Sequence, residues 1–206
     1  MKKVGVAILG LGVVGGGTYK IIKDNHDYFM RTQNLDVNVE MVLEKNLERA
    51  KSLGIPESNC AKSIEEVISN PNVDIVVEVI GGVEPAKTFV LKALMSGKSV
   101  VTSNKELFSK YWPELEEEAK STNAGLFFEA SCVGGVPIIR TLQEGMQANK
   151  IESIKGIING TTNYILTKMA NEGTSYEDAL KEAQSKGYAE FDPSADIDGI
   201  DVKYKC

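Results

Sequence analysis

Three glycines near the start of the chain have the spacing that binds a pyrophosphate. Gly10, Gly12 and Gly15 come directly after an apolar run. That run, Val4–Leu9, has the composition of a buried strand, and a helical apolar pattern continues beyond the glycines to Ile22. In such a unit the first glycine permits the tight turn, the second lets the backbone approach the phosphates, and the third lets the helix pack closely. Because the helix N terminus also attracts anions, the stretch predicts dinucleotide binding.

Acidic side chains gather near the end of the chain, just ahead of a lysine. They are Glu190, Asp192, Asp196, Asp198 and Asp201, and the lysine is Lys205. Hydride removal from an alcohol requires a group that takes the hydroxyl proton, and with a single histidine the candidates are Lys, Tyr, Asp and Glu. Carboxylates would also bind the ammonium group of an amino-acid substrate. The alternative is an acidic surface loop, in which Asp201 and Lys205 form an ordinary i,i+4 helix pair worth ~0.3 kcal/mol.

A charged pair follows the second predicted strand, where a dinucleotide-binding unit meets the adenosine ribose. The strand is Val37–Leu43, and Glu44 and Lys45 come directly after it. Glu44 would bind a ribose 2′-hydroxyl, whereas Lys45 would neutralise a 2′-phosphate. Two solvated loop charges are the alternative, and these residues leave the choice between NAD and NADP open.

Strand and helix patterns alternate through the first 130 residues. The buried run Val73–Ile80 ends in Gly81 and Gly82, which would let a ligand lie close to the backbone, with a plain turn as the alternative. We further expect a helix over 85–95, a strand over 98–102, a helical piece over 114–120 after Pro113, and a strand over 125–130. This alternation predicts an α/β fold, a Rossmann-like doubly wound parallel sheet.

The sequence changes character after residue 130. A glycine-rich stretch, CVGGVP over 132–137, leaves the predicted nucleotide-binding domain. Beyond it we expect a helix over 137–146, a strand over 151–158, and helices over 160–170 and 175–185. We therefore predict a dinucleotide-binding domain over 1–130 and the incomplete start of an α+β dimerisation and substrate domain over 131–206.

Composition excludes several classes of function. The 206 residues carry a formal net charge of −6, so a nucleic-acid surface is not expected, and no apolar run approaches the ~20 residues of a membrane span. Cys60, Cys132 and Cys206 are widely spaced and odd in number, which is typical of a reducing cytosol. One histidine and no CxxC exclude a Cys/His zinc site and a His-dependent triad within the chain. We expect a cytoplasmic protein that acts on a small molecule.

Four stretches together resemble homoserine dehydrogenase, and they run collinearly through the whole chain. They are GLGVVGGGT (10–18), VTSNKELFS (101–109), EASCVGGVPIIR (129–140), and NGTTNYILTKMANEG (159–173) continuing to EAQSKGYAEFDPSADIDGIDVKYK (182–205). The combination of NGTTNYIL with GYAEFDP is typical of this family. The resemblance implies NAD(P)-dependent interconversion of L-homoserine and L-aspartate 4-semialdehyde, on the route to threonine and methionine, by a homodimer or larger assembly.

The resemblance also implies roles for individual residues. Lys205 matches the proposed proton donor, which Asp201 would orient, and Lys105 matches a lysine near the nicotinamide and the substrate. The expected substrate contacts are Glu190, Asp196, Asp201 and Thr161. The expected contacts of NADP or NAD, with NADP slightly preferred, are Gly10, Gly12, Val13, Val14, Gly15, Lys45, Gly81, Thr102, Ser103, Lys105 and Gly187. The expected sodium ligands are Glu129 and the backbone carbonyls at Cys132, Gly134 and Val136.

The family continues well beyond the position of Cys206, so we expect a truncated chain whose homodimer belongs to the full-length protein. Two other interpretations stay open. One is an NAD(P)-binding module without turnover. The other is an acylating semialdehyde dehydrogenase with Cys132 as nucleophile, which requires an activating base, usually a histidine. The single histidine, His26, lies beside the first predicted helix.

Overall fold

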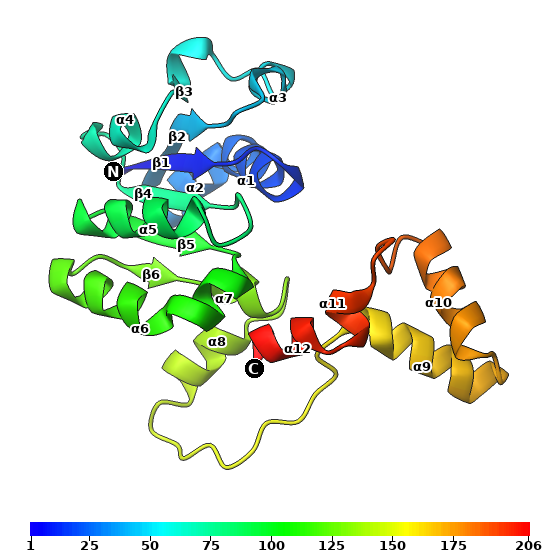
Figure 1. The fold of residues 1–206 in the computed structure, drawn as a ribbon. Helices are drawn as coiled ribbons and strands as arrows, with labels where there is room; N and C mark the ends of the chain where they lie inside the picture. Colours follow the sequence, from blue (N-terminus) through cyan, green and yellow to red (C-terminus); the bar gives the residue numbers. More distant parts are fainter. The chain divides into compact units, whose positions relative to one another are not determined.

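A computed structural model describes all residues, 1–206, and they form two compact units, Met1–Ile139 and Arg140–Cys206. The first unit contains a six-stranded sheet in the order β3-β2-β1-β4-β5-β6, in which every pair of neighbours is parallel (Figure 1). The order reverses between β1 and β4, as in dinucleotide-binding sheets. The predicted doubly wound parallel α/β sheet is therefore confirmed.

The strands of the first unit are long at its centre and short at both sides. They are β1 (Lys2–Leu9), β2 (Leu35–Leu43), β3 (Cys60–Ala61), β4 (Ile75–Glu78), β5 (Ser99–Thr102) and β6 (Leu126–Phe127). The helices are α1 (Val13–Asp24), α2 (His26–Gln33), α3 (Leu47–Ser52), α4 (Ile64–Ser69), α5 (Ala86–Met95), α6 (Lys105–Thr122) and α7 (Glu129–Cys132), and η1 (Glu57–Asn59) is a 3₁₀ turn. We call the side on which the strands end the carboxyl edge of the sheet.

Strand β1 is buried on both faces. Ala7 and Leu9 belong to a core cluster with α4, α5 and α6, whereas Val6 and Ile8 belong to a second cluster with α1 and α3. Crossover helices cover both faces of a parallel sheet, so its central strand has no polar side. This two-sided burial explains why β1 reads as a continuous apolar run.

Three elements within residues 1–146 differ from the sequence prediction. Helix α2 begins at His26, between the first helix and the second strand, where no helix was predicted, because Asn25 interrupts the helical path for only one residue. The strand predicted over 125–130 is limited to β6, because Glu129 already begins α7. The helix predicted over 137–146 is reduced to α8 (Ile138–Arg140) and a π-helical turn, η2 (Thr141–Gly145).

Helix α6 bends where a proline was expected to start a new helical piece. Tyr111 has non-helical dihedral angles, φ −130° and ψ 15°, and Pro113 lies inside the helix just after it. Proline lacks the N–H that would continue the hydrogen-bond ladder, and its ring collides with the preceding turn. The predicted second piece over 114–120 is therefore confirmed as the straight part beyond this bend.

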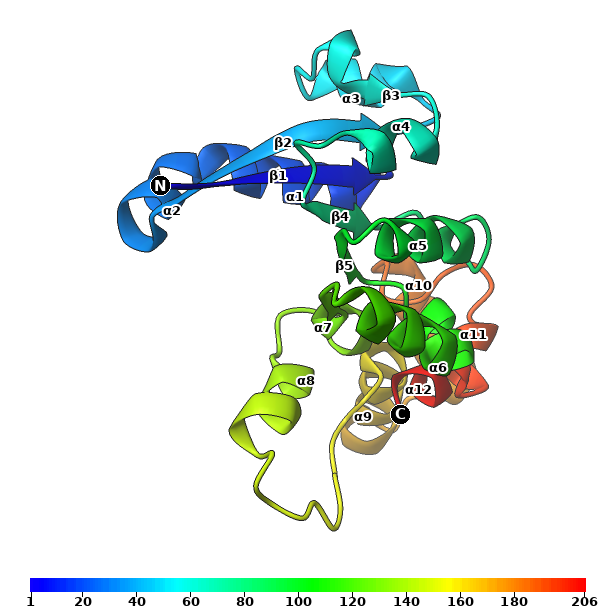
Figure 2. The same cartoon turned by 90° about the vertical axis from the view of Figure 1, so that its left-hand side faces the viewer.

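Beyond η2, the second unit contains four helices and no strand. They are α9 (Gly160–Glu172), α10 (Tyr176–Ser185), α11 (Ser194–Ile197) and α12 (Ile200–Lys205). The strand predicted over 151–158 is wrong, because residues 150–159 form neither helix nor strand and make the long loop that leads into α9 (Figure 2). Ile154 and Ile157 on this loop are 63% and 77% exposed. A strand needs a neighbour for its backbone hydrogen bonds, and this unit has no other strand.

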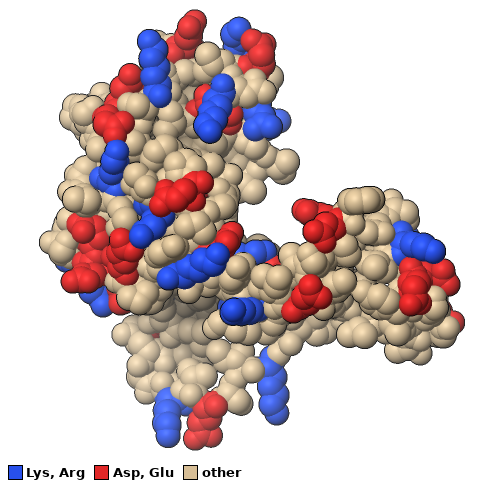
Figure 3. Space-filling view, in the orientation of Figure 1, with Lys and Arg blue, Asp and Glu red and all other residues tan.

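Charges of both signs are interspersed over the face shown in Figure 3. The net charge of −6 is therefore not concentrated in one patch of that face. None of the helices combines the length and the apolar character needed to cross a bilayer.

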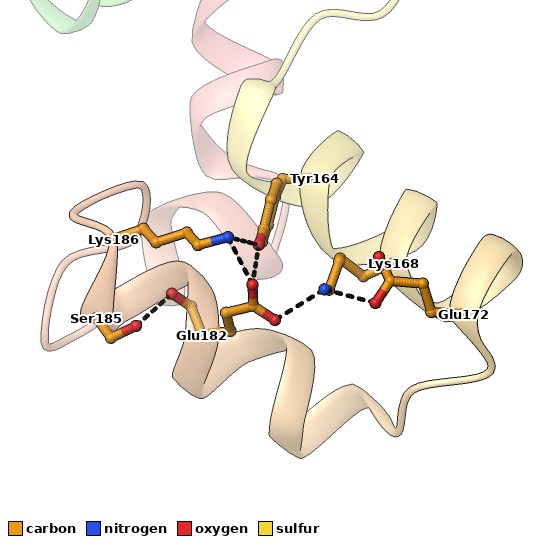
Figure 4. Close-up of polar contacts among 6 residues, drawn as sticks. All are labelled: Tyr164, Lys168, Glu172, Glu182, Ser185 and Lys186. Carbon is orange, nitrogen blue, oxygen red and sulfur yellow. Dashed lines mark hydrogen bonds and ion pairs between the residues drawn. The ribbon is translucent and has the colours of Figure 1, made fainter.

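A cluster around Glu182 joins α9 to α10 (Figure 4). The Glu182 carboxylate accepts the Tyr164 hydroxyl at 2.7 Å and pairs with Lys186 at 2.6 Å and with Lys168 at 3.0 Å. The hydrogen bonds from Lys186, Tyr164 and Lys168 lower the pKa of Glu182 to about 2, and the Glu182 carboxylate in turn raises the pKa of Lys186. The second unit is thus held by polar contacts above a small core of Ile165, Ala179 and Ala183.

We expect Glu182→Gln to lower the unfolding midpoint of the second unit at pH 7 and to lower it less at pH 3. A carboxylate whose pKa is lowered on folding stabilises the fold fully above its unfolded pKa, near 4.5, and loses that contribution as the pH falls towards 2. Calorimetry of both proteins at the two pH values measures the difference. Glu48→Gln, which removes the exposed partner of Lys51, is the control and should leave both midpoints unchanged. An equal loss at pH 7 and pH 3 would contradict this expectation.

Candidate cofactor and substrate sites

The turn between β1 and α1 is closed on its inner side and open at Gly12. Gly10 has a φ of +93°, which favours glycine, and a Cβ on residue 15 would lie 1.9 Å from the carbonyl oxygen of Gly10. A Cβ on residue 12 would meet no atom within 4 Å. The tight turn, the open approach and the close packing expected from the glycine spacing are all present in the geometry.

The N terminus of α1 is available to a ligand. Gly12 occupies the N-cap position, no side chain caps the helix, and its first turn holds no acidic residue. Val13 and Val14, which follow, are 96% and 54% exposed. A helix start of this kind has N–H groups without helical partners and the positive end of the dipole, so an anion stabilises it.

Glu44 holds the glycine turn from the end of β2. Its carboxylate accepts the N–H of Leu11 at 2.6 Å and the N–H of Asn46 at 2.8 Å, and the Arg49 guanidinium lies 3.8 Å away. Burial acts to raise the pKa of Glu44, but the hydrogen bonds from Asn46 and Leu11 outweigh it and the net pKa is lowered. The largely buried Glu44 side chain therefore fixes the glycine turn through hydrogen bonds, and Glu44 is not a solvated loop charge.

A cavity of about 620 Å³ opens at the carboxyl edge beside this turn. Gly10 and Gly12 line it, together with apolar side chains that include Ile80, Pro85 and Phe89. Its charged lining residues are Glu44, Lys45, Arg49, Glu57 and Lys62. Apolar walls with a few charged groups suit a flat heterocycle that carries phosphate. Lys45 therefore lies where an adenosine ribose was expected.

Four of the predicted cofactor residues lie between the end of β4 and the start of α6, at or just beyond the ends of the two strands. Gly81 follows β4, Thr102 ends β5, and Ser103 leads through Asn104 to Lys105, the first residue of α6. The Asn104 side chain caps α6 and also donates to the carbonyl of Gly82 at 2.6 Å, so it joins the two loops. The Thr102 side chain is buried and its hydroxyl is hydrogen-bonded within the protein.

The second unit brings together three of the predicted catalytic and substrate residues. Lys205 lies 2.6 Å from Asp201 one helical turn earlier on α12, and it donates to the carbonyl of Ile158 at 3.1 Å. The Asp201 side chain is 6% exposed and that of Lys205 19%. The i,i+4 pair is confirmed, but the alternative of an exposed surface pair is not. Asp196 joins the same group through Asn159.

Asn159 was not singled out from the sequence. Its amide group donates to Asp196 at 2.7 Å and to Asp201 at 2.9 Å, while its oxygen accepts the N–H of Thr162 and so caps α9. A buried asparagine ahead of a helix is an ordinary N-cap in sequence, and nothing local indicates the two carboxylates 37 and 42 residues away. Both donors and the acceptor of this one side chain are therefore used at the site.

The other predicted substrate and cofactor residues of this unit lie around the α10–α11 connection. Glu190 is exposed, and Gly187 is left-handed, with a φ of +73°, just beyond α10. The Thr161 hydroxyl donates to the carbonyl of Tyr188 at 2.7 Å, so Thr161 holds this connection against α9.

The predicted sodium ligands lie on α7 and the loop that follows it in the first unit. Glu129 begins α7 and accepts the N–H of Ile139 at 2.8 Å, and this contact spans the segment that contains Cys132, Gly134 and Val136. The chain holds no cluster of three or more His, Cys, Asp or Glu side chains that could bind a metal. A site here would depend on backbone carbonyls, which hard cations accept as ligands.

Known protein families match both units. Residues 10–129 match the model described as "Homoserine dehydrogenase, NAD binding domain", and residues 137–206 match the model described as "Homoserine dehydrogenase". The chain belongs to the homoserine dehydrogenase family. It is 47% identical over 205 residues to the homoserine dehydrogenase of Bacillus subtilis and 42% identical to that of Neisseria gonorrhoeae. Each match covers 100% of this chain and 47% of the relative, so the chain spans about half the length of these homoserine dehydrogenases.

Solved structures of the family share the fold. The homoserine dehydrogenase of Thiobacillus denitrificans has a TM-score of 0.90 and 44% identity, and the match covers 100% of this chain and 47% of that one. A hyperthermophilic archaeal homoserine dehydrogenase mutant in complex with NADPH has a TM-score of 0.84 and 37% identity, and the match covers 98% of this chain and 67% of that one. The acylating interpretation with Cys132 gains no support, because its one candidate base, His26, is held by Asp36 at 2.9 Å.

We expect Gly12→Val to fold normally and to lose affinity for NADPH. The new side chain meets no protein atom near its Cβ and occupies the open approach, whereas Gly15→Ala places a methyl group against the Gly10 carbonyl. Gly15→Ala should therefore cost about 1–3 kcal/mol of unfolding free energy by overpacking. Fluorescence titration with NADPH and thermal unfolding of both variants separate the two effects. Unchanged NADPH binding by a folded Gly12→Val protein would argue against the pyrophosphate site.

Proposed function

We propose that these residues form the cofactor domain and the start of the substrate domain of an NAD(P)-dependent homoserine dehydrogenase. In this proposal residues 1–130 bind the dinucleotide and residues 131–206 begin the dimerisation and substrate domain. The reaction is the interconversion of L-homoserine and L-aspartate 4-semialdehyde. The observation that carries the proposal is the match of both units to this family's models, with a lysine paired to a buried carboxylate in the second unit.

The proposed chemistry divides between a hydride and a proton. Bound NAD(P) accepts or supplies the hydride. Lys205 exchanges the hydroxyl proton of the substrate at its Nζ, and Asp201, which contacts that Nζ at 2.6 Å, orients it. Glu190 and Asp196 bind the ammonium group of homoserine, aided by Thr161. Lys105 provides a second positive charge, which stabilises an oxygen that becomes negative.

The charges at the ribose end of the cavity support a preference for NADP. The ordinary ribose ligand of an NAD site is a carboxylate at the end of β2, and both oxygens of Glu44 already accept backbone N–H groups. Lys45, Arg49 and Lys62 line the same cavity and would neutralise a 2′-phosphate. Both NAD and NADP fit the glycine turn, and the basic residues favour the phosphorylated form.

We further propose a bound sodium ion, a homodimer of the full-length protein, and a cytoplasmic role in threonine and methionine biosynthesis. The segment from Glu129 to Val136 supports the ion, because it offers one carboxylate and backbone carbonyls at Cys132, Gly134 and Val136, and the hydrogen bond to Ile139 closes it. The other statements rest on the family resemblance.

We expect Lys205→Met, in a protein of full family length, to lower kcat for homoserine oxidation by about 100- to 10,000-fold while NADPH and homoserine still bind. The parent's homoserine-dependent reduction of NAD(P) tests the proposed activity itself. A turnover within a few-fold of the parent would leave Lys205 as a structural partner of Asp201.

A companion variant, Asn159→Ser, tests the geometry around Lys205 rather than the proton. Serine keeps the helix cap but cannot donate to both Asp196 and Asp201. We expect KM for homoserine to rise and NADPH affinity to stay unchanged. Ser175→Ala removes the N-cap of α10 instead and serves as the control for loss of stability alone.

We expect Glu129→Gln to weaken the dependence of activity on sodium. A neutral amide in place of the carboxylate removes the one formal negative charge among the proposed ligands. Initial rates are measured over a range of sodium concentrations, and potassium replaces sodium so that the ionic strength stays constant. Identical sodium dependence in the parent and the variant would count against the site.

A further inference from the structure

Glu78 is a fully buried carboxylate that the proposed chemistry does not use. It ends β4, it is 0% exposed, and it forms no ion pair. A buried carboxylate is unfavourable unless hydrogen bonds replace its hydration, and an apolar residue would fill the same position at less cost. The hydrogen bonds that Glu78 forms should therefore explain why a carboxylate occupies this position at the carboxyl edge.

The two oxygens of Glu78 bind the two loops that follow neighbouring strands. Oε1 accepts the N–H of Ile80, on the loop after β4, at 2.8 Å. Oε2 accepts the hydroxyl of Thr102, at the end of β5, at 2.7 Å, and that hydroxyl accepts the N–H of Asn104 at 3.0 Å. One carboxylate thus orients the chain directly beyond both strand ends.

The contacts close into a ring through Asn104. Its side-chain amide donates to the carbonyl of Gly82 at 2.6 Å, and its oxygen accepts the N–H of Leu107 and so begins α6. Gly81 and Gly82 are both left-handed, with φ of +85° and +70°, a conformation that specifies the shape of this loop. The loop after β4, the loop after β5 and the first residue of α6, Lys105, are therefore one hydrogen-bonded group.

We propose that Glu78 is a positioning residue for hydride transfer. It holds residues 80–82 and 103–105 in one arrangement, so that the backbone at Gly81 and the side chain of Lys105 meet the nicotinamide end of the cofactor. This inference rests on the proposed function, because it takes Lys105 to act there. Glu78 itself touches neither cofactor nor substrate.

The test compares four variants in a protein of full family length. Glu78→Gln leaves one oxygen to accept two donors, and Thr102→Val removes the hydroxyl at constant shape, whereas Thr102→Ser keeps it. Asp74→Asn is the matched control, since Asp74 lies just before the same strand and accepts the N–H of Gly5 at 2.8 Å at the opposite edge of the sheet. We measure kcat, KM for homoserine, the Kd of NADPH and the unfolding midpoint.

We expect Glu78→Gln and Thr102→Val to lower kcat by about 100-fold, the effect of a misplacement near 1 Å, with NADPH affinity changed less than about threefold. Thr102→Ser should restore kcat to within about threefold of the parent, and Asp74→Asn should lower the unfolding midpoint without changing kcat. If Glu78→Gln fails to fold, the difference in kcat between Thr102→Val and Thr102→Ser tests the positioning role instead.

Three results would overturn the inference, and they are distinguishable. An active parent with active Glu78→Gln and Thr102→Val proteins overturns the positioning role alone, and so does a loss of kcat that follows the unfolding midpoint in all four variants. A parent without homoserine-dependent turnover overturns the proposed function and the positioning role together.

Discussion

The contact between Gly15 and the carbonyl of Gly10 determines where α1 begins. A Cβ at residue 15 would lie 1.9 Å from that oxygen, so only glycine lets the helix start directly at the end of β1. The N terminus of α1 is thereby brought to the carboxyl edge, where its unpaired N–H groups and dipole favour an anion. Three features surround this close contact. They are the cavity, the hydrogen bond from Leu11 to Glu44, and the open approach at Gly12.

Carboxylates hold the loops of the carboxyl edge in shape. Glu44 accepts a backbone N–H of the glycine turn, and Glu78 accepts one from the loop after β4. Loops at a ligand site cannot be held by apolar packing alone, because their backbone groups must stay accessible on one side. A buried acceptor at a strand end satisfies the inner N–H groups and leaves the outer side open. The apolar core of this unit lies deeper, between the sheet and its helices.

In the second unit, the side-chain amide of Asn159 holds separate segments together through hydrogen bonds. Asn159 donates to Asp196 and Asp201 and caps α9 with its oxygen, so helix start and carboxylates share one side chain. Two carboxylates near each other repel, and a neutral double donor between them lowers that cost without neutralising either charge. Asp201 contacts Lys205 at 2.6 Å, and both side chains are largely shielded from solvent. This shielding distinguishes the pair from the exposed pairs along other helices.

Local patterns in the sequence determined the glycine turn, the buried strands, the bend at Pro113 and the Asp201–Lys205 pair, because each depends on neighbours within a few residues. Tertiary structure alone decided that Glu78 meets Thr102, 24 residues away, and that Asn159 meets Asp201, 42 residues away. It also decided that residues 151–158 form no strand, since alternation of apolar side chains needs a pairing edge that this unit lacks. Hydrogen bonds between distant segments depend on how the elements pack, and no local spacing of residues encodes them.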